Sequence, residues 1–418
     1  QLGTIKGQHQ FSVASDTLLA LTRQPEPMPR PLTLNCPHCG ALFQRVPLQS
    51  GQWSRCTRCD EVLETYSPFT PQAFLALVIA AFIVFLMANS FPIMTLSFQG
   101  TAQSTTFLGA VKATWQAGFW EVAILTGLFG FGFPLLKLCV LLLLFVPMSL
   151  GRLPSYFELA LRSLGWIRHW CMVPVFLLGS LVAIVKLVDL AQLVVGSGLY
   201  TTAVSALFFT ALIKLTPTRI RYLAIDAGLP AVPPTVESAP TPACLPKSWA
   251  LLLAAAILYI PANALPVMYI TTISGRQGHT ILGGVIELAN MGSWGIAGVV
   301  FTASVFVPIF KILLLAILLW LTQNRSAIRL RRRTRLYRLV EAIGPWSMLD
   351  VFVVILLVAL GNFGQLLVIE PGAGAVAFGA VVVLTMLAAM NFDSRLAWRR
   401  AGHRRSIRWT ADNVSTAV

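Results

Sequence analysis

The stretch Val305–Trp320, VFVPIFKILLLAILLW, is apolar enough to lie in a lipid bilayer, yet it carries Pro308 and, three residues later, Lys311. The earlier stretch Phe131–Phe145, FGFPLLKLCVLLLLF, places Lys137 three residues after a proline in the same way. A lysine inside a membrane span costs about 3 kcal/mol or more, so it usually faces a protein interior or a wet cavity. Two lysines at corresponding places predict a duplicated membrane unit with a polar interior, as in a transporter component.

The composition is that of a helical membrane protein. The 418 residues are 56% hydrophobic and only 11% charged, with a mean hydropathy of +0.75. These values exclude an ordinary soluble enzyme and predict an all-α polytopic membrane protein. The formal net charge of +15 could suggest nucleic-acid binding. However, the arginines cluster between apolar runs, which fits the cytoplasmic excess of Lys and Arg in membrane proteins and predicts no nucleic-acid partner.

Two cysteine pairs near the N-terminus predict a metal site. They are CPHC at 36–39 and CTRC at 56–59, with sixteen residues between them. Tetrahedral zinc takes four thiolates from two such turns, so we expect one small zinc ribbon over residues 32–66. With all four positions filled by protein, the zinc would be structural, His38 would lie outside the ligand set, and the ribbon would largely unfold without metal. The predicted ligands are Cys36, Cys39, Cys56 and Cys59.

Eight apolar segments follow, each near the roughly 20 residues that a membrane helix needs. They lie near residues 72–96, 119–147, 171–192, 199–216, 249–271, 295–321, 347–369 and 374–391. We therefore predict a flexible leader, the ribbon, a four-helix membrane unit, a Pro-rich extended linker, a second four-helix unit and a basic tail. These parts correspond to residues 1–31, 32–66, 71–216, 217–247, 248–393 and 394–418. The polar leader lacks the apolar core of a cleavable signal peptide.

The basic residues predict the orientation of the chain in the membrane. The connections 148–170 and 322–346 and the tail are rich in arginine, whereas 97–118 and 272–294 each hold a single Lys or Arg. Because Lys and Arg accumulate on the cytoplasmic side, we expect both termini, the linker and both arginine-rich connections in the cytoplasm.

The two membrane units can be aligned by register. ANSFPIM at 88–94 matches ANALPVM at 262–268 at an offset of 174, and the same offset relates Lys137 to Lys311. After the arginine-rich connections the offset is 176, and Gly-x-Gly at 196–198 then matches Gly-x-Gly at 372–374. Four helices per unit is an even number, so the units would insert in the same direction as a parallel repeat.

Polar side chains at similar depth suggest a functional site in the second unit. Ser347 and Asp350 are three residues apart and share a helix face, and we expect Asp350 to neutralise Lys311. Membrane-embedded carboxylates are the usual proton relays, so we hypothesise a protonation or substrate-gating site. The alternative is a static ion pair that only fixes helix packing. The predicted site consists of Lys311, Ser347, Asp350 and Thr385.

The first unit carries its charges elsewhere. Pro174 occupies the position of Asp350, so Lys137 lacks the equivalent carboxylate. Lys186 and Asp189 instead lie three residues apart near the periplasmic end of the third span, where a lysine can also extend to the interface. We add these residues to the candidate transport network. Two asparagines near the periplasmic ends of the first and fifth spans complete it: Asn89 and Asn263.

Taken together, these motifs resemble the paraquat-inducible protein A family over nearly the whole chain. The resemblance rests on the CPHC and CTRC pairs, the duplicated Asn-x-x-Pro span ends, FVPIFK, GPWSMLDVFVV and PGAGAVAFGAVVVLTML. Members are multi-pass inner-membrane proteins of Gram-negative bacteria that work with a periplasmic MCE-domain protein, PqiB or LetB, which forms a tunnel. The resemblance implies transport of membrane phospholipids between the inner and outer membranes, with protons as a candidate driving force and no ATP hydrolysis by this chain. The family often has a second ribbon, where this chain has only Cys244.

Three functions of different class remain open. A lipid-transport subunit explains the lysine and carboxylate in the membrane. A structural anchor for the MCE-domain partner explains the repeat and topology, but gives no reason to retain Lys311 and Asp350. A redox or metal sensor would use the ribbon thiolates, although a closed four-thiolate site is usually inert. The chain has no Walker A, GxSxG or HExxH motif, so we predict no enzyme.

Overall fold

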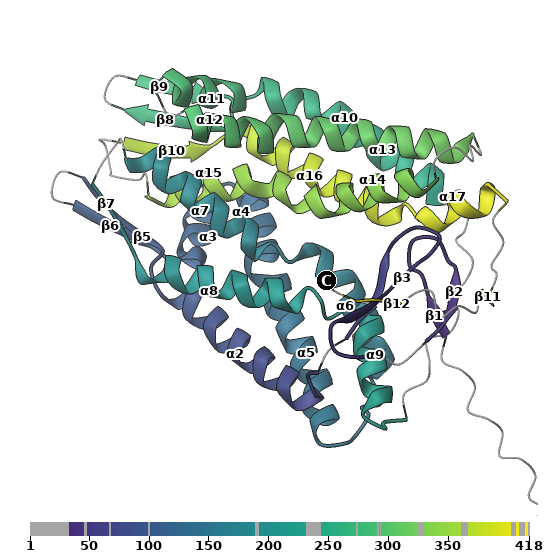
Figure 1. Ribbon diagram of the computed structural model, residues 1–418. Coiled ribbons are helices and arrows are strands. Elements are labelled where there is room, and N and C mark those ends of the chain that lie inside the picture. The colour runs from purple at the N-terminus through teal and green to yellow at the C-terminus, as the bar shows by residue number, and fades with distance from the viewer. Residues whose placement is uncertain are drawn as a thin grey trace, which may run out of the picture.

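Helices make up most of the chain and run side by side, with small sheets at both ends (Figure 1). The structure is a computed structural model that describes residues 33–45, 48–66, 68–98, 101–188, 192–230, 244–272, 275–290, 292, 294–324, 330–360, 367–402, 407–408 and 414–416. The predicted leader and residues 231–243 of the predicted linker lie outside these ranges.

The first membrane unit combines long helices with one three-stranded sheet. Its helix α2 begins with Pro71 behind Thr70, whose side chain accepts a hydrogen bond from the Ala73 amide, a favourable start for a helix. The elements are α2 (Pro71–Ser90), β5 (Met94–Phe98), β6 (Thr101–Thr105), α3 (Phe107–Gln116), α4 (Trp120–Gly127), a π-helical segment (Leu128–Gly132), α5 (Phe133–Ser149), α6 (Phe157–Ile167), a 3-10 segment (Arg168–Trp170), α7 (Val173–Val188), β7 (Gln192–Val195) and α8 (Ser197–Leu212).

The second unit repeats this order of elements. From β8 to α13 every boundary lies 174 residues after its counterpart in the first unit. The elements are α10 (Cys244–Ala264), β8 (Met268–Thr272), β9 (Gly275–His279), α11 (Ile281–Asn290), α12 (Trp294–Phe301), a π-helical segment (Thr302–Phe306), α13 (Val307–Gln323), α14 (Leu330–Ile343), a 3-10 segment (Gly344–Met348), α15 (Leu349–Leu360), β10 (Leu367–Pro371) and α16 (Ala373–Asn391).

Seven helical stretches of the described chain are long and apolar enough to cross a membrane. An eighth results if Ser197–Leu212 and Pro217–Asp226, which meet at a bend of 67°, count as one span. Two of the spans begin earlier than predicted, because α6 and α14 continue across a 3-10 segment into the next helix as Phe157–Val185 and Leu330–Leu360.

The prediction of an all-α fold was incomplete, because two three-stranded sheets lie at one end of the helices, here called the sheet end. Strand β5 pairs antiparallel with β6 and β7, and β8 pairs antiparallel with β9 and β10. Four predicted spans, near 72–96, 171–192, 249–271 and 347–369, therefore run into strands. In α2 and α10 the helix ends just before Pro92 and Pro266, because the residue before a proline disfavours helical geometry.

The Gly-x-Gly pairs explain why each sheet closes against its unit. The Gly196 and Gly198 amides donate to the Ile93 and Pro92 carbonyls, at 2.9 Å each. A Cβ atom on either glycine would overlap the carbonyl groups of the Phe91–Pro92 turn, and the same holds for the matching glycines of the second unit. Only glycine allows this approach of two backbones, so the repeated motif is a packing requirement.

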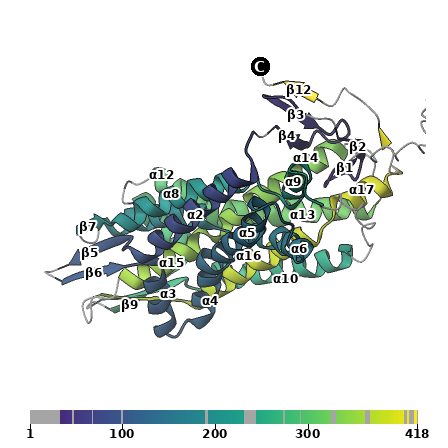
Figure 2. The same ribbon diagram turned by 90° about the horizontal axis from the view of Figure 1, so that it is seen from below.

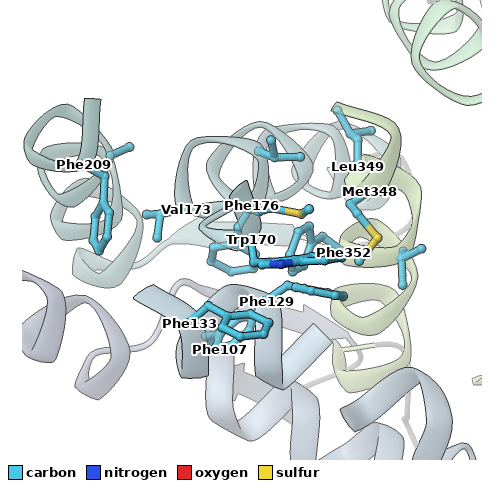
Figure 3. Packing of buried hydrophobic residues seen from close by; sticks show 14 of the residues in the cluster. Phe107, Phe129, Phe133, Trp170, Val173, Phe176, Phe209, Met348, Leu349 and Phe352 are labelled. Carbon is cyan, nitrogen blue, oxygen red and sulfur yellow. The ribbon is translucent and has the colours of Figure 1, made fainter. Parts of the chain in front are cut away.

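The two units meet along α15, which is buried on all sides from Val351 to Leu360. It packs on α7 and α3 of the first unit. Phe107 of α3, Phe176 of α7 and Phe352 of α15 form one aromatic core at this contact, with 4.6 Å between the first two ring centroids (Figure 3). Gly179 of α7 leaves room for the Phe352 side chain.

The prediction of an extended linker over residues 217–247 was wrong at both ends of that segment. Residues Pro217–Asp226 form helix α9, which starts after Thr216 and buries Ile220, Tyr222 and Ala224. Helix α10 begins at Cys244, inside the predicted linker. An apolar face every three to four residues in α9 and a proline at its first position favour the helix over an extended tether.

The cysteine-rich segment folds into short strands at the opposite end of the molecule, here called the ribbon end (Figure 1). Two strands from the predicted basic tail join it: β11 pairs parallel with β2, and β12 pairs antiparallel with β3. The tail also forms helix α17. The elements are β1 (Thr33–Asn35), β2 (Leu42–Gln44), β3 (Gln52–Arg55), β4 (Val62–Thr65), α17 (Ser394–Arg400), β11 (Ile407–Arg408) and β12 (Val414–Thr416).

Candidate functional site

Four buried cysteines gather at the ribbon end. The Sγ atoms of Cys36, Cys39, Cys56 and Cys59 all lie within 4.8 Å of one another. Cys36 and Cys59 are 3.4 Å apart, and Cys39 and Cys56 are 3.5 Å apart. Sulfurs at the corners of a zinc tetrahedron with 2.3 Å bonds would be about 3.8 Å apart. The four thiols are therefore spaced to hold a metal ion with little movement.

Each cysteine pair lies in a tight turn that places both sulfurs on one side. The Gly40 amide donates to the Cys36 carbonyl at 3.0 Å, and the Asp60 amide donates to the Cys56 carbonyl at 2.8 Å. Gly40 and Asp60 adopt left-handed backbone conformations, with φ of 68° and 65°. Glycine takes this conformation freely, and aspartate is among the few other residues that tolerate it.

His38 is not part of the four-sulfur cluster and has other partners. Its Nε2 atom is 3.7 Å from Glu61 Oε2, and its ring meets Tyr337 edge to face with centroids 6.1 Å apart. Burial lowers the pKa of His38 below its ordinary value. A neutral His38 packed between Glu61 and α14 belongs to the contact between the ribbon and the second unit.

Lys311 is buried in the second unit, with 2% of its surface exposed. Its Nζ atom has no hydrogen-bond partner among the residues that the structure describes, and the buried Ser347 hydroxyl has none there either. The Thr385 hydroxyl donates to the Val382 carbonyl of its own helix at 2.9 Å. Helices α13 and α16 and the Gly344–Met348 segment pack against one another, so three of the predicted site residues come from neighbouring elements.

Asp350, the fourth predicted residue of this site, lies in the first turn of α15. It follows directly on the segment that carries Ser347. A Cβ atom built on Gly344, at the start of that segment, would lie 3.5 Å from Lys311 Nζ. The Lys311 ammonium thus lies against the backbone that leads to Asp350, and neutralisation of one by the other stays a prediction.

Lys137 has the same burial as Lys311, 2% exposed, but different surroundings. Its Nζ atom lies 5.6 Å from the centre of the Phe209 ring, within range of a cation–π interaction. Phe209 stands where the second unit has Thr385, and Cys171 stands where it has Ser347. At these matched positions the first unit therefore carries less polar residues than the second.

The other predicted residues do not join either lysine in the described structure. Asn89 donates to the Phe85 carbonyl at 2.8 Å, and Asn263 donates to the Tyr259 carbonyl at 2.9 Å, each within its own helix at the sheet end. The side chain of Lys186 and all of Asp189 lie outside the described residues. Their part in a polar network stays a prediction.

Two features near the lysines were not anticipated from the sequence. A π-helical segment precedes each Pro-Lys motif, at Leu128–Gly132 and Thr302–Phe306. The available signal was the proline itself, because it removes a backbone donor and disturbs the helix before it. Such π-helical turns occur frequently at functional sites.

The second unit also has an open hollow of about 460 Å³ at the sheet end. Within it, His279 Nδ1 and Glu287 Oε2 are 3.2 Å apart. In the first unit the equivalent helix, α3, packs on α15, whereas α11 contacts chiefly α12. The hollow is lined by Gly278, His279, Thr280, Gly283, Ile286, Glu287 and Asn290.

Comparison with known proteins gives a consistent match. The model of a family described as Paraquat-inducible protein A matches residues 72–222 and 245–402. The chain is 30% identical to intermembrane transport protein PqiA of Escherichia coli K12, over 87% of this chain and 95% of that protein. It is 30% identical to lipophilic envelope-spanning tunnel protein A of the same strain, over 89% and 92%.

A probable intermembrane transport protein of Haemophilus influenzae is 28% identical, over 88% of this chain and 95% of the relative. No solved structure matches the chain significantly. The family match covers both membrane units and begins after the cysteine-rich segment.

Proposed function

Because the chain belongs to the paraquat-inducible protein A family, we propose that it is an inner-membrane subunit that moves phospholipids between the inner and outer membranes of a Gram-negative bacterium. Two of the relatives are named as intermembrane transport proteins and one as a lipophilic envelope-spanning tunnel protein. Those names support transport of a lipophilic substrate across the envelope. The partner is a periplasmic MCE-domain protein that forms the tunnel.

In this proposal the helices form eight spans, as two parallel four-helix units over residues 71–216 and 248–393. The ribbon end, which carries the arginine-rich α14 and α17, lies in the cytoplasm. The sheet end then faces the periplasm and the tunnel partner. The hollow beside α11 lies at that end, where a headgroup leaving the bilayer could meet His279 and Glu287.

The burial of Lys311 is the observation that best supports a transport role. A buried ammonium without a hydrogen bond in the described structure is costly, and stability alone gives no reason to keep it. A transient partner, such as the ionised Asp350 carboxylate or an anionic headgroup, would compensate that cost during a transport cycle, and a proton that binds Asp350 would remove the carboxylate's charge. We therefore assign Lys311, Ser347, Asp350 and Thr385 to a gating site coupled to protons. Lys137, Lys186, Asp189, Asn89 and Asn263 are proposed as supporting residues.

The cysteine cluster is proposed to hold one structural zinc ion. The donor set fits, because four thiolates favour zinc and no carboxylate stands among the ligands. The ion would tie the two turns of the ribbon together. All four positions would be filled by Cys36, Cys39, Cys56 and Cys59, which leaves no open position for catalysis.

Lipid transfer between liposomes tests the proposal. Wild type and Asp350→Asn would be reconstituted and compared with and without a pH gradient. Glu121→Gln, a change of an exposed carboxylate in the first turn of α4, is the control. We expect the gradient to accelerate transfer by wild type and the control, and Asp350→Asn to reduce transfer at least about tenfold, or about 1.4 kcal/mol in barrier.

Equal transfer by all three proteins, with Asp350→Asn folded and partner binding intact, would instead favour the structural anchor. Size-exclusion profiles and thermal unfolding check the folding, and co-purification with the MCE-domain protein checks partner binding. If transfer depends on Asp350 but not on the pH gradient, the result would support the gating site and contradict proton coupling.

A further inference from the structure

The ribbon lies against helices from both membrane units. It sits at one end of the molecule beside α9, which follows the first unit and packs on its helix α6, and beside α14 of the second unit and α17 of the tail, and both views agree (Figures 1 and 2). Tyr222 of α9, Leu330 of α14 and Trp398 of α17 share one apolar cluster with the four cysteines. The ribbon is therefore placed to connect the two units.

Helix α14 of the second unit binds the backbone of the second cysteine turn through hydrogen bonds. Arg331 of α14 donates from Nη2 to the Thr57 carbonyl at 2.7 Å and from Nε to the Arg58 carbonyl at 3.2 Å. Thr57 and Arg58 are the two residues between Cys56 and Cys59. The two carbonyl oxygens are oriented toward Arg331 only when that turn is folded.

Two carboxylates next to the same turn bind the same helix. Asp60 and Glu61 follow Cys59 directly. Arg335 Nη2 lies 3.6 Å from Asp60 Oδ2, and Arg338 forms an ion pair with Glu61. Arg331, Arg335 and Arg338 recur every three to four residues, which aligns them on one face of α14.

A different part of the ribbon binds α9, which packs on α6 of the first unit. Arg45, which follows β2, donates to both carboxylate oxygens of Asp226 at 2.6 and 2.7 Å and also to Glu64 of β4. Its guanidinium lies over the Tyr222 ring, 4.6 Å from the ring centre. A bidentate pair with an aromatic stack is the stronger kind of arginine contact.

The ribbon needs its metal to present these groups. Its apolar core beyond the cysteines consists chiefly of Leu34, Ala41 and Phe43, too few to fold a segment of this size alone. A four-thiolate site of this kind supplies the folding free energy when metal binds. The acceptors for Arg331 and the position of Arg45 therefore depend on the filled site.

Helix α14 connects the ribbon to the segment that contains Ser347 and Asp350. It continues through Gly344–Met348 into α15, the path that bears Ser347 and Asp350. Glu341 of α14 also contacts the first unit, with Oε1 3.1 Å from His169 Nε2. A change at Arg331 would thus reach the segment beside Lys311 through one continuous helical path.

We propose that the metal-loaded ribbon is a strap that holds α9 and α14 at a fixed separation and so positions the Gly344–Asp350 segment beside Lys311. The metal then determines how the two membrane units are arranged, beyond stabilising the ribbon. The inference rests on the proposed metal site and is independent of the proposed lipid substrate.

Hydrogen–deuterium exchange of the full chain in lipid nanodiscs tests the strap. Exchange would be compared for protein loaded with Zn²⁺ and for protein stripped by a chelator. We expect chelation to accelerate exchange at least about tenfold in residues 33–66 and also in α9 and α14, because local unfolding exposes amides. The amides of α2 and α10 should keep their rates, and added Zn²⁺ should restore the rest. Acceleration confined to residues 33–66 would overturn the proposal.

Variants that leave the cysteines intact separate the strap from simple folding of the ribbon. With one bound zinc per chain verified, Arg331→Gln should accelerate exchange in α14, and Arg45→Gln should do so in α9. Arg332→Gln, at an exposed position on the same helix, is the matched control and should change neither. Unchanged exchange in α14 for zinc-loaded Arg331→Gln would also overturn the proposal. These readouts need no lipid transfer, so they stand or fall separately from the transport function.

Discussion

The two buried lysines occupy the same place in two copies of one structural unit. Lys137 and Lys311 each follow a π-helical segment and a proline, and each is 2% exposed. The units differ at three matched positions on the helices that follow. Phe209, Cys171 and Pro174 of the first unit correspond to Thr385, Ser347 and Asp350 of the second.

The difference shows that the scaffold and the chemistry of the repeat are separable. Both units contain the Gly-x-Gly motif that packs against the turn after the first helix. A Cβ atom at either glycine would not fit there in either unit. Residues around the lysine are free to diverge, since the helices pack with either set. The second unit combines the more polar residues at the matched positions with the open hollow at the sheet end.

Removing each lysine should give the largest contrast between the units. We expect Lys311→Met to slow lipid transfer at least about tenfold, or about 1.4 kcal/mol in barrier, because the gating charge is lost. Its stability should be unchanged or higher, because a buried charge is removed. Lys137→Met should slow transfer by no more than about threefold, as expected of a supporting residue, and the loss of a cation–π contact of about 1–2 kcal/mol should offset any gain from removing its buried charge. Transfer rates and denaturant unfolding measure both effects.

Equal losses of transfer in the two methionine variants would break the comparison. The lysines would then act as an equivalent pair, and the divergence around them would have no functional weight.

Exchanging Phe209 and Thr385, the aromatic and hydroxyl residues at matched positions, should have an intermediate effect. Thr385→Phe should slow transfer several-fold by crowding Lys311, with an overpacking cost of about 1–3 kcal/mol in the free energy of unfolding. Phe209→Thr should lower that free energy by about 3 kcal/mol, because Phe209 packs on Phe85 with ring centroids 5.7 Å apart. Its transfer rate per folded molecule should stay near wild type.

A transfer defect in folded Phe209→Thr larger than that in Thr385→Phe would place the transport site in the first unit. Rates are therefore normalised to the folded fraction, measured by size-exclusion chromatography.

The smallest effect is expected from the serine and cysteine pair. Ser347→Cys installs the first-unit residue and should change the free energy of unfolding by less than about 1 kcal/mol, since the Ser347 hydroxyl makes no hydrogen bond to other described residues. Transfer should fall less than about threefold, or about 0.7 kcal/mol. The reciprocal Cys171→Ser is the control and should not alter transfer. A loss above about tenfold in Ser347→Cys would mean that the hydroxyl binds the substrate or proton directly.

Much of the architecture could be predicted because it depends on local patterns of residue types along the chain. Apolar runs of about 20 residues indicate spans, and the CPHC and CTRC pairs indicated a cluster that the structure assembles with all four sulfurs within 4.8 Å. The repeat register also followed from the residues alone, because Pro, Gly and Lys recur at fixed offsets. The strands at the sheet end were missed, since short apolar segments after a span read as more helix.

The sequence by itself determined the membrane class, the repeat, the cysteine cluster and the family. Those properties depend on residue types at fixed spacing along the chain. Only the tertiary structure decided that Arg45 joins the ribbon to α9 and Arg331 joins it to α14, and that Phe209 faces Lys137. Such contacts join residues up to 274 positions apart, and their geometry arises only when helices distant in the chain pack together.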